Sequence, residues 1–347
     1  MKNTILLSFF LFYSLLAQEL SDGFILYTPF NISDSTHMTT YLVDQDLNEI
    51  NRWNHDYEAI PASMPYLMQD STIWYPSKVS QPLMASGGVG GRIQKLDWNG
   101  NILWDYTISN DSLQHHHDIE PLPNGNILVI AWERKTLQEA LDMGREIIES
   151  PLQQMWSEAI FEIEPVGNDS ANIVWEWHLW DHLIQDVNPS LSNYGIIEEH
   201  PELLDINLGS IGFGPALDNA DWIHFNSIHY NEGLEQIILS SRMMSEIYII
   251  DHSTTTEEAA SHSGGNSGKG GDFLYRWGNP QNYLRETGAT QILNTQHSAN
   301  WIDDGYPGEG NIIIFNNFHY GNNSAIIEIS PPVDSNGHYS ISEGNSY

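Results

Sequence analysis

The chain has 347 residues, and its 46 acidic residues against 12 lysines and arginines give a formal net charge of −34. Such a charge repels polyanions, so we expect neither nucleic acid nor an anionic membrane surface as a partner. Cysteine is absent, which excludes disulfides, thiol nucleophiles and thiolate metal ligands.

The N-terminus has the pattern of a secretory signal. Lys2 precedes thirteen uncharged residues, from Ile5 to Ala17, a stretch too short for a transmembrane helix. We therefore expect residues 1–17 to be a signal peptide, and a periplasmic or secreted protein without membrane insertion. The sequence does not indicate an oligomeric state.

Pairs of short strands recur through residues 18–347. One type begins at a polar entrance and passes through a turn with Gly or Asn into an apolar strand, as in HDIEPLPNGNILVIAWE from His117. The second type ends in an aromatic edge, as in RIQKLDWNGNILWDY from Arg92. Together they form a four-stranded unit that occurs four times, after a half unit from Thr39. This repeat predicts an all-β protein, a β-propeller.

The segments between the units predict insertions. Helical spacing indicates a helix over residues 135–149, and a long segment covers residues 181–220. The Gly/Ser/Thr-rich run from His252 to Asp272 is expected to be a flexible insertion rather than a phosphate loop, because Gly270 stands where such a loop has Ser or Thr. The chain ends after an outer strand pair, so we expect the domain at 18–347 to lack its last strands.

Three histidines stand at the entrance of the first strand in consecutive units: His117, His224 and His297. The innermost strands of a propeller line its channel, so these imidazoles are expected to converge. Arg242 follows the second strand of the middle unit, and a bulge would bring it close to His224. The four side chains predict a basic pocket for an oxyanion in an otherwise acidic protein.

Other readings of the histidines remain open. A single His at a strand entrance is more often structural than catalytic. A zinc site is the weaker alternative, because Asp118 is the one evident carboxylate that could orient a ligand. In the HHH triplet, His115 is expected at the rim and His116 competes with His117 for the channel. His178 and His182 have helical spacing without the Glu of a zinc-protease motif, and His182 is a candidate for the rim.

The stretches HHDIEPLPNGNILV, DWIHFNSIHYN, ILSSRMMSEIYIIDHSTTT, HSGGNSGKGGDFLYRWGNP and QHSANW resemble the bacterial aryl-sulfate sulfotransferase family from about Gly23 to the end. The resemblance implies a six-bladed propeller without a cofactor or metal. It also implies transfer of a sulfuryl group from an aryl sulfate to a phenol in ping-pong fashion, through a sulfurylated histidine.

By the same resemblance, His297 is the nucleophile, and His224 and Arg242 bind the sulfuryl oxygens. His117, with His116 as its competitor, is assigned to the substrate site. A separate hypothesis, which the resemblance does not supply, makes His117 the acid for the leaving phenol and the base for the acceptor. The alternative function is a non-catalytic propeller that binds sulfated ligands or protein partners.

Overall fold

The computed structural model describes residues 23–29, 38–56, 59–148, 150–212, 218–284, 290–319, 321 and 323–339. The expected signal peptide lies outside these residues. Within them, no helix combines the length and the hydropathy that crossing a lipid bilayer requires.

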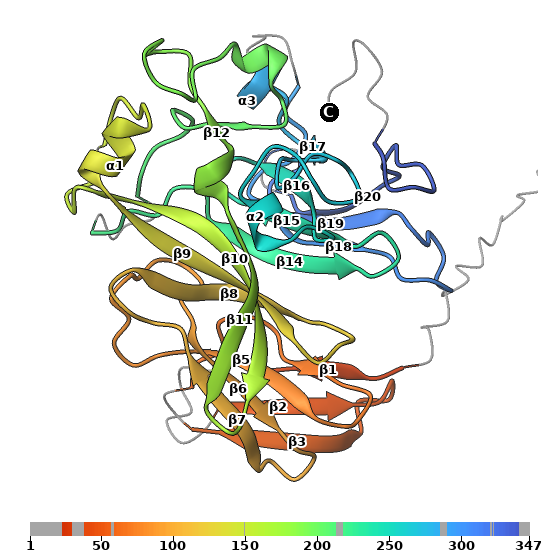
Figure 1. The fold of residues 1–347 in the computed structure, drawn as a ribbon. Coiled ribbons are helices and arrows are strands. Elements are labelled where there is room, and N and C mark those ends of the chain that lie inside the picture. The colour runs from red at the N-terminus through yellow and green to blue at the C-terminus, as the bar shows by residue number, and fades with distance from the viewer. Residues whose placement is uncertain are drawn as a thin grey trace, which may run out of the picture.

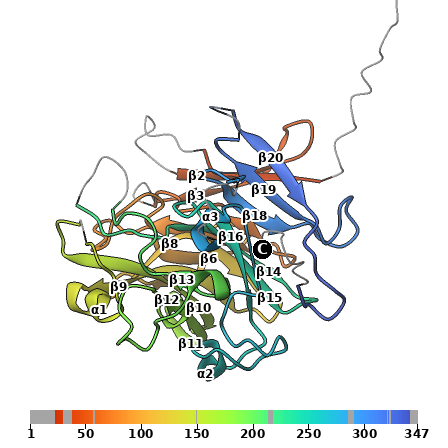
Figure 2. The same ribbon diagram turned by 90° about the horizontal axis from the view of Figure 1, so that it is seen from above.

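Five antiparallel sheets follow one another as the blades of a β-propeller (Figures 1 and 2), which confirms the predicted fold class. The first blade has β1 (Ile25–Tyr27), β2 (Met38–Val43) and β3 (Glu49–His55). The second has β4 (Tyr66–Leu67), β5 (Ile73–Lys78), β6 (Gly91–Leu96) and β7 (Ile102–Thr107), and the third has β8 (Leu113–Pro121), β9 (Ile127–Thr136), β10 (Gln154–Val166) and β11 (Ser170–His178). The fourth has β14 (Phe225–Asn231), β15 (Gln236–Ser241), β16 (Glu246–Asp251) and β17 (Tyr275–Trp277), and the fifth has β18 (His297–Trp301), β19 (Ile312–Asn316) and β20 (Ala325–Ile329).

The blades follow the predicted units with two differences at the ends. The expected half unit gains a third strand, β1, which pairs with β2. In the fifth blade, the described residues after β20 form an isolated bridge between Val333 and Tyr339 in place of a fourth strand. Pro331 and Pro332 come after Ser330, one residue past the end of β20, and because proline has no N–H to donate, a regular hairpin does not continue there. The resemblance implied six blades, and the described residues form five.

Short elements fill the insertions. The predicted helix at 135–149 is only α1 (Leu137–Asp142), which Thr136 and Glu139 start with a capping box. It ends before Gly144, whose φ of 92° is not helical. The other elements are η1 (Leu179–His182), β12 (Leu183–Ile184), η2 (Ile197–Glu199), β13 (Leu204–Asp205), α2 (Thr256–Ala259) and α3 (Gln281–Leu284).

Tryptophans on the outer strands join each of the first three blades to the next. The indole N–H of Trp53 in β3 donates to the carbonyl of Asp97, at 2.8 Å. Trp104 in β7 donates to Ser170 at 2.8 Å, and Trp175 in β11 donates to the hydroxyl of Thr254 at 3.1 Å. The aromatic edge of the repeat is thus a recurring contact between blades, because a buried indole N–H needs an acceptor.

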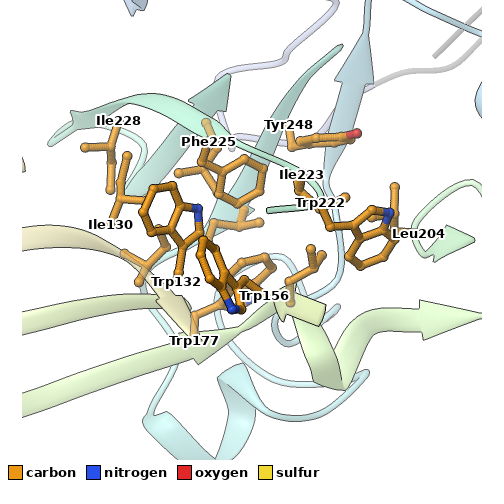
Figure 3. Packing of buried hydrophobic residues seen from close by; sticks show 14 of the residues in the cluster. Ile130, Trp132, Trp156, Trp177, Leu204, Trp222, Ile223, Phe225, Ile228 and Tyr248 are labelled. Atoms are coloured by element: carbon orange, nitrogen blue, oxygen red, sulfur yellow. The ribbon is translucent and has the colours of Figure 1, made fainter. Parts of the chain in front are cut away.

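The largest core lies between the third and fourth blades and supports the innermost strands. Trp132, Trp156 and Trp177 point toward one another there, and Phe225 and Tyr248 pack from the other blade (Figure 3). The innermost strands β8, β14 and β18 contact their neighbours in turn. Figure 1 shows the sheet β8–β11 between the first two blades and the last two. The core therefore supports β8 and β14, the strands in or next to which His117 and His224 lie.

The Gly/Ser/Thr-rich run is packed against the third blade, which corrects the expectation of a flexible insertion. Its Gly271 accepts a hydrogen bond from the indole of Trp177 at 2.8 Å. A Cβ on Gly271 would lie 2.6 Å from the imidazole of His182. Glycine is required here because the backbone approaches the blade closely.

Candidate active site

β-bulges at the entrances of the innermost strands aim the histidines into the channel. The ladder shifts register between His115 and Ile119 in β8, and between Phe225 and Ser227 in β14. His117 and His224 adopt left-handed φ values of 51° and 58°. Such a conformation costs a non-glycine residue about 1–3 kcal/mol, and bulges commonly redirect a side chain at a functional site.

The fifth blade also has a β-bulge with a left-handed residue at the entrance of its innermost strand, but the left-handed residue comes one position after the histidine. Its register changes between His297 and Asn300, and Ser298 is the residue with a left-handed φ, of 54°. His117 and His224 therefore occupy the same position in their blades, as predicted, because each is the left-handed residue of its bulge. His297 comes one residue before the left-handed residue of its own bulge, Ser298.

The structure brings the predicted residues together. The rings of His117 and His224 lie 4.6 Å apart between centroids at an angle of 77°. The N–H of Arg242 donates to the carbonyl of His224 at 3.1 Å, so the bulge in β14 places Arg242 as the sequence predicted. Burial lowers the pKa of His117 well below its usual value, and His224, His297 and Arg242 lower it further by charge repulsion. The ring contact and the backbone bond join His117, His224 and Arg242, and His297 is near enough to affect the protonation of His117.

His297 is uncharged at neutral pH. Burial lowers its pKa, and His224 and Arg242 lower it further against a hydrogen bond with Thr295. Its Nδ1 lies 3.1 Å from the carbonyl of Thr295 and 3.0 Å from Nδ2 of Asn317. The tautomer of His297 depends on which of these contacts Nδ1 makes. When Nδ1–H donates to the carbonyl of Thr295, Nε2 has the lone pair that a nucleophile requires, and when Nδ1 accepts from Nδ2–H of Asn317, Nε2 carries the proton.

Two carboxylates behind the histidines have no counterpart in the sequence prediction. Asp221 Oδ2 lies 2.5 Å from Nδ1 of His224. Glu158 Oε2 lies 2.9 Å from Nε2 of His116. Asp221 stands three residues before His224 in the motif DWIH, so the short spacing was a usable signal. Glu158 lies on β10, and no sequence pattern connects it to β8.

Asp118 does not orient a channel histidine, which corrects its place as the candidate orienting carboxylate. Its carboxylate accepts hydrogen bonds from Ser63 at 2.9 Å and from Tyr66 at 2.6 Å, on the neighbouring blade. Burial raises its pKa to about 6, although these hydrogen bonds act in the opposite direction. Asp118 therefore joins blades.

His115 is fully buried, so its expected place at the rim is wrong. Its Nδ1 accepts a hydrogen bond from the N–H of Gly91 at 2.8 Å. His116 is also fully buried and stacks on Trp132, with 4.1 Å between ring centroids. His116 thus lies behind the channel and His117 faces it.

A glycine-rich loop at residues 87–91 covers these rings, and the sequence analysis missed it. A Cβ on Gly88 would lie 2.1 Å from Nε2 of His117. A Cβ on Gly90 would lie 2.4 Å from Nδ1 of His115. Any side chain at Gly88 would displace the His117 ring, so only glycine lets the loop backbone lie this close to the ring.

The histidines of the WEWHLWDHL segment lie elsewhere. His178 is near Glu133, at 3.3 Å. His182 is fully buried and not at the rim: its Nε2 is 2.8 Å from the carbonyl of Ala259 and its Nδ1 is 2.8 Å from Asp272. His182, His262 and Asp272 are the one group of three possible metal ligands within 4.8 Å of one another among the described residues. Both ring nitrogens of His182 therefore contact the insertion at residues 252–272 and hold it against the third blade.

The fold and the site define a β-propeller with a histidine–arginine cluster at one end of its channel. The model of the arylsulfotransferase (ASST) family matches residues 17–343, so the chain belongs to this family. No curated protein matches the chain.

The solved structures that resemble this chain are only distantly similar. A protein of unknown function from Bacteroides caccae is 10% identical over 80% of this chain and 61% of its own, with a TM-score of 0.39. Hydrazine synthase from Kuenenia stuttgartiensis is 11% identical over 85% of this chain and 68% of its own, with a TM-score of 0.40. The periplasmic gluconolactonase of Pseudomonas aeruginosa is 10% identical over 93% of this chain and 69% of its own, with a TM-score of 0.39. The chain spans about 61% of the length of the first of these proteins.

Proposed function

We propose that the protein is an aryl-sulfate sulfotransferase that acts by a ping-pong mechanism through a sulfurylated His297. Family membership supports sulfotransferase chemistry in general. The observation that carries the mechanism is the cluster of an uncharged His297 with His117, His224 and Arg242 at one channel end. The expected substrates are an aryl sulfate and a phenol, and export to the periplasm or beyond belongs to the same proposal.

In the first half-reaction, Nε2 of His297 attacks sulfur and forms an N–S bond, while the bond from sulfur to the phenolic oxygen breaks. The electron pair leaves with the phenol. Arg242 supplies fixed positive charge to the sulfuryl oxygens, and such charge stabilises a transition state that spreads negative charge over them. Its pKa is lowered by burial, but an arginine remains charged throughout the working range.

His224 is suited to hold a second sulfuryl oxygen. Its Nδ1–H donates to Asp221. For Nε2 to donate as well, the ring must carry both protons, and the carboxylate of Asp221 then supplies the balancing negative charge. In the second half-reaction the acceptor's phenolic oxygen forms an O–S bond while the N–S bond to His297 breaks. The electron pair of the N–S bond returns to Nε2 of His297, and the acceptor phenol gives up its proton.

The test is incubation of the protein with a chromogenic aryl sulfate and a phenol. We expect release of the chromophore, parallel lines in double-reciprocal plots, and a protein one sulfuryl group heavier when the acceptor is omitted. Binding of the aryl sulfate without turnover would instead support a non-catalytic sulfate-binding propeller. Loss of turnover on chelation would contradict a mechanism without metal.

A further inference from the structure

A continuous chain of buried hydrogen bonds leads from the channel into the core. Nδ1 of His117 lies 2.8 Å from Nδ1 of His116, and Nε2 of His116 lies 2.9 Å from Oε2 of Glu158. His116 and Glu158 are fully buried, and His117 is 9% exposed, at the channel. The proposed function uses His117 alone, so the two groups behind it are unexplained.

The hydrogen-bond contacts allow two proton arrangements with both imidazoles neutral. In the first, Glu158 is a carboxylate that accepts from Nε2–H of His116, Nδ1 of His116 accepts from Nδ1–H of His117, and Nε2 of His117 has a lone pair. In the second, the carboxylic acid of Glu158 donates to Nε2 of His116, whose Nδ1–H donates to Nδ1 of His117. Nε2 of His117 then carries a proton. The two arrangements differ by one proton.

The surroundings place the extra proton on Glu158. Burial raises the pKa of Glu158 well above its usual value, and the neighbouring Asp221 raises it further, against hydrogen bonds from the N–H groups of Phe225 and His224. Burial lowers the pKa of His116 and of His117, and the histidines His115 and His224 oppose a charge on either ring. His297 and Arg242 add to this repulsion at His117. An imidazolium is therefore disfavoured along the chain.

We propose that Glu158, His116 and His117 form a proton wire that makes Nε2 of His117 an acid in the first half-reaction and a base in the second. The proposal rests on the proposed function. As the S–O bond breaks, the departing phenolate takes the proton from Nε2 of His117. Nδ1 of His117 takes the proton of His116 Nδ1, and Nε2 of His116 takes the proton of Glu158. In the second half-reaction the acceptor phenol returns one proton by the reverse route.

His117 is the catalytic residue in this scheme, and Glu158 and His116 are positioning residues that act through it. Before the first half-reaction the wire holds the proton that the departing phenolate takes, and Glu158 and His116 are fully buried from water. General acid–base catalysis of this kind contributes about 10²–10⁴-fold, most where the leaving group is a poor one. The dependence of rate on the leaving group therefore separates the wire from a merely structural role.

The first experiment compares Glu158→Gln with wild type on a series of aryl sulfates whose phenols range from strongly to weakly acidic. We expect the variant to lose about 10²–10⁴-fold in kcat/KM with the least acidic phenol, and little with a nitrophenol. Glu162→Gln is the matched control, because Glu162 also lies on β10 and pairs with a histidine, His252, at 2.9 Å. Glu162→Gln should leave kcat/KM unchanged both for the least acidic phenol and for the nitrophenol. An equal loss across the series would overturn the wire.

The second experiment needs no variant. In mixtures of H₂O and D₂O, wild type acting on the least acidic donor should give a curved proton inventory, because several protons move together. A linear inventory would overturn the wire even if Glu158→Gln failed to fold. A wild-type protein without any turnover would overturn the proposed function and the wire together, whereas turnover with equal losses overturns the wire alone.

Discussion

Different groups lie at the two ends of the channel strands. The cluster of His117, His224, His297 and Arg242 lies near the start of β14 and β18 and at the bulge inside β8. Around the other end of these strands, a pocket of about 580 Å³ is lined by Glu120, Glu232, Asp303 and Asp304, with Trp301 beside them. The same three strands therefore present imidazoles and a guanidinium at one end and carboxyl groups at the other.

Under the proposed function, the anionic donor binds a protein of charge −34 at the end of the strands that carries Arg242, away from these carboxyl groups. Burial raises the pKa of Glu120 well above its usual value, and Asp118 raises it further. Burial and mutual repulsion lower the pKa of His117 at the opposite end. Because fields in a cleft depend on the groups that line it, net charge alone does not select the ligand. The predictions below test this assignment of the two ends.

The largest effect is expected for His297→Asn. Without Nε2 no N–S bond forms, so both half-reactions should fall by on the order of 10⁴-fold or more. His229→Asn is the matched control, because His229 lies on β14 near the acidic pocket and should leave kcat/KM within about twofold. Release of chromophore under saturating phenol measures both. Unchanged activity in the His297 variant would contradict its role as nucleophile.

Arg242→Ala should reduce kcat/KM for the donor by about 10²–10³-fold, because a preorganised charge on the sulfuryl oxygens is lost. Initial rates at several donor concentrations should show a higher KM and a lower kcat. Arg134→Ala is the control, since Arg134 lies on β9 with only a distant ion pair to Asp111, at 3.8 Å. A change confined to the acceptor's KM would contradict contact with the sulfuryl group.

The buried histidine end should also be sensitive to acid. Burial lowers the pKa of His115 to about 3, below its value of about 6.5 in the unfolded chain. The unfolded state therefore binds protons more readily, and the free energy of unfolding falls as pH drops from about 6.5 toward 3. The slope is about 1.4 kcal/mol per pH unit for this histidine.

Denaturant unfolding between pH 7 and pH 4.5 measures this contribution. His115→Gln should flatten the slope, because an amide does not titrate. Substitution of the exposed His338, which is 56% exposed, should leave the slope as it is in wild type. Parallel curves for wild type and His115→Gln would show that His115 does not resist protonation in the folded protein.

The sequence predicted the features that are repeated from blade to blade. The repeat gave the blades, and a histidine at each strand entrance gave His117, His224 and His297. Contacts across blades leave no such pattern. Glu158 and Gly88 lie far from His117 along the chain, and only folding brings them to it. The expectation of His115 at the rim was wrong because its ring packs against Gly90 and Gly91 on the neighbouring blade, a contact that the sequence does not reveal.

The smallest effect is expected at the acidic end. The double variant Asp303→Asn and Asp304→Asn removes two negative charges from the acidic pocket. It leaves His117, His224, Arg242 and His297 unaltered. Surface charges more than about 8–10 Å apart are screened at physiological ionic strength, so kcat/KM for the donor should stay within about twofold. At low salt the double variant should have a slightly higher kcat/KM than wild type. Removing two negative charges weakens the repulsion between the protein and the anionic donor, and low salt screens that repulsion less. A large loss in the double variant would mean that the donor contacts the acidic pocket, and the assignment of the two ends would be wrong.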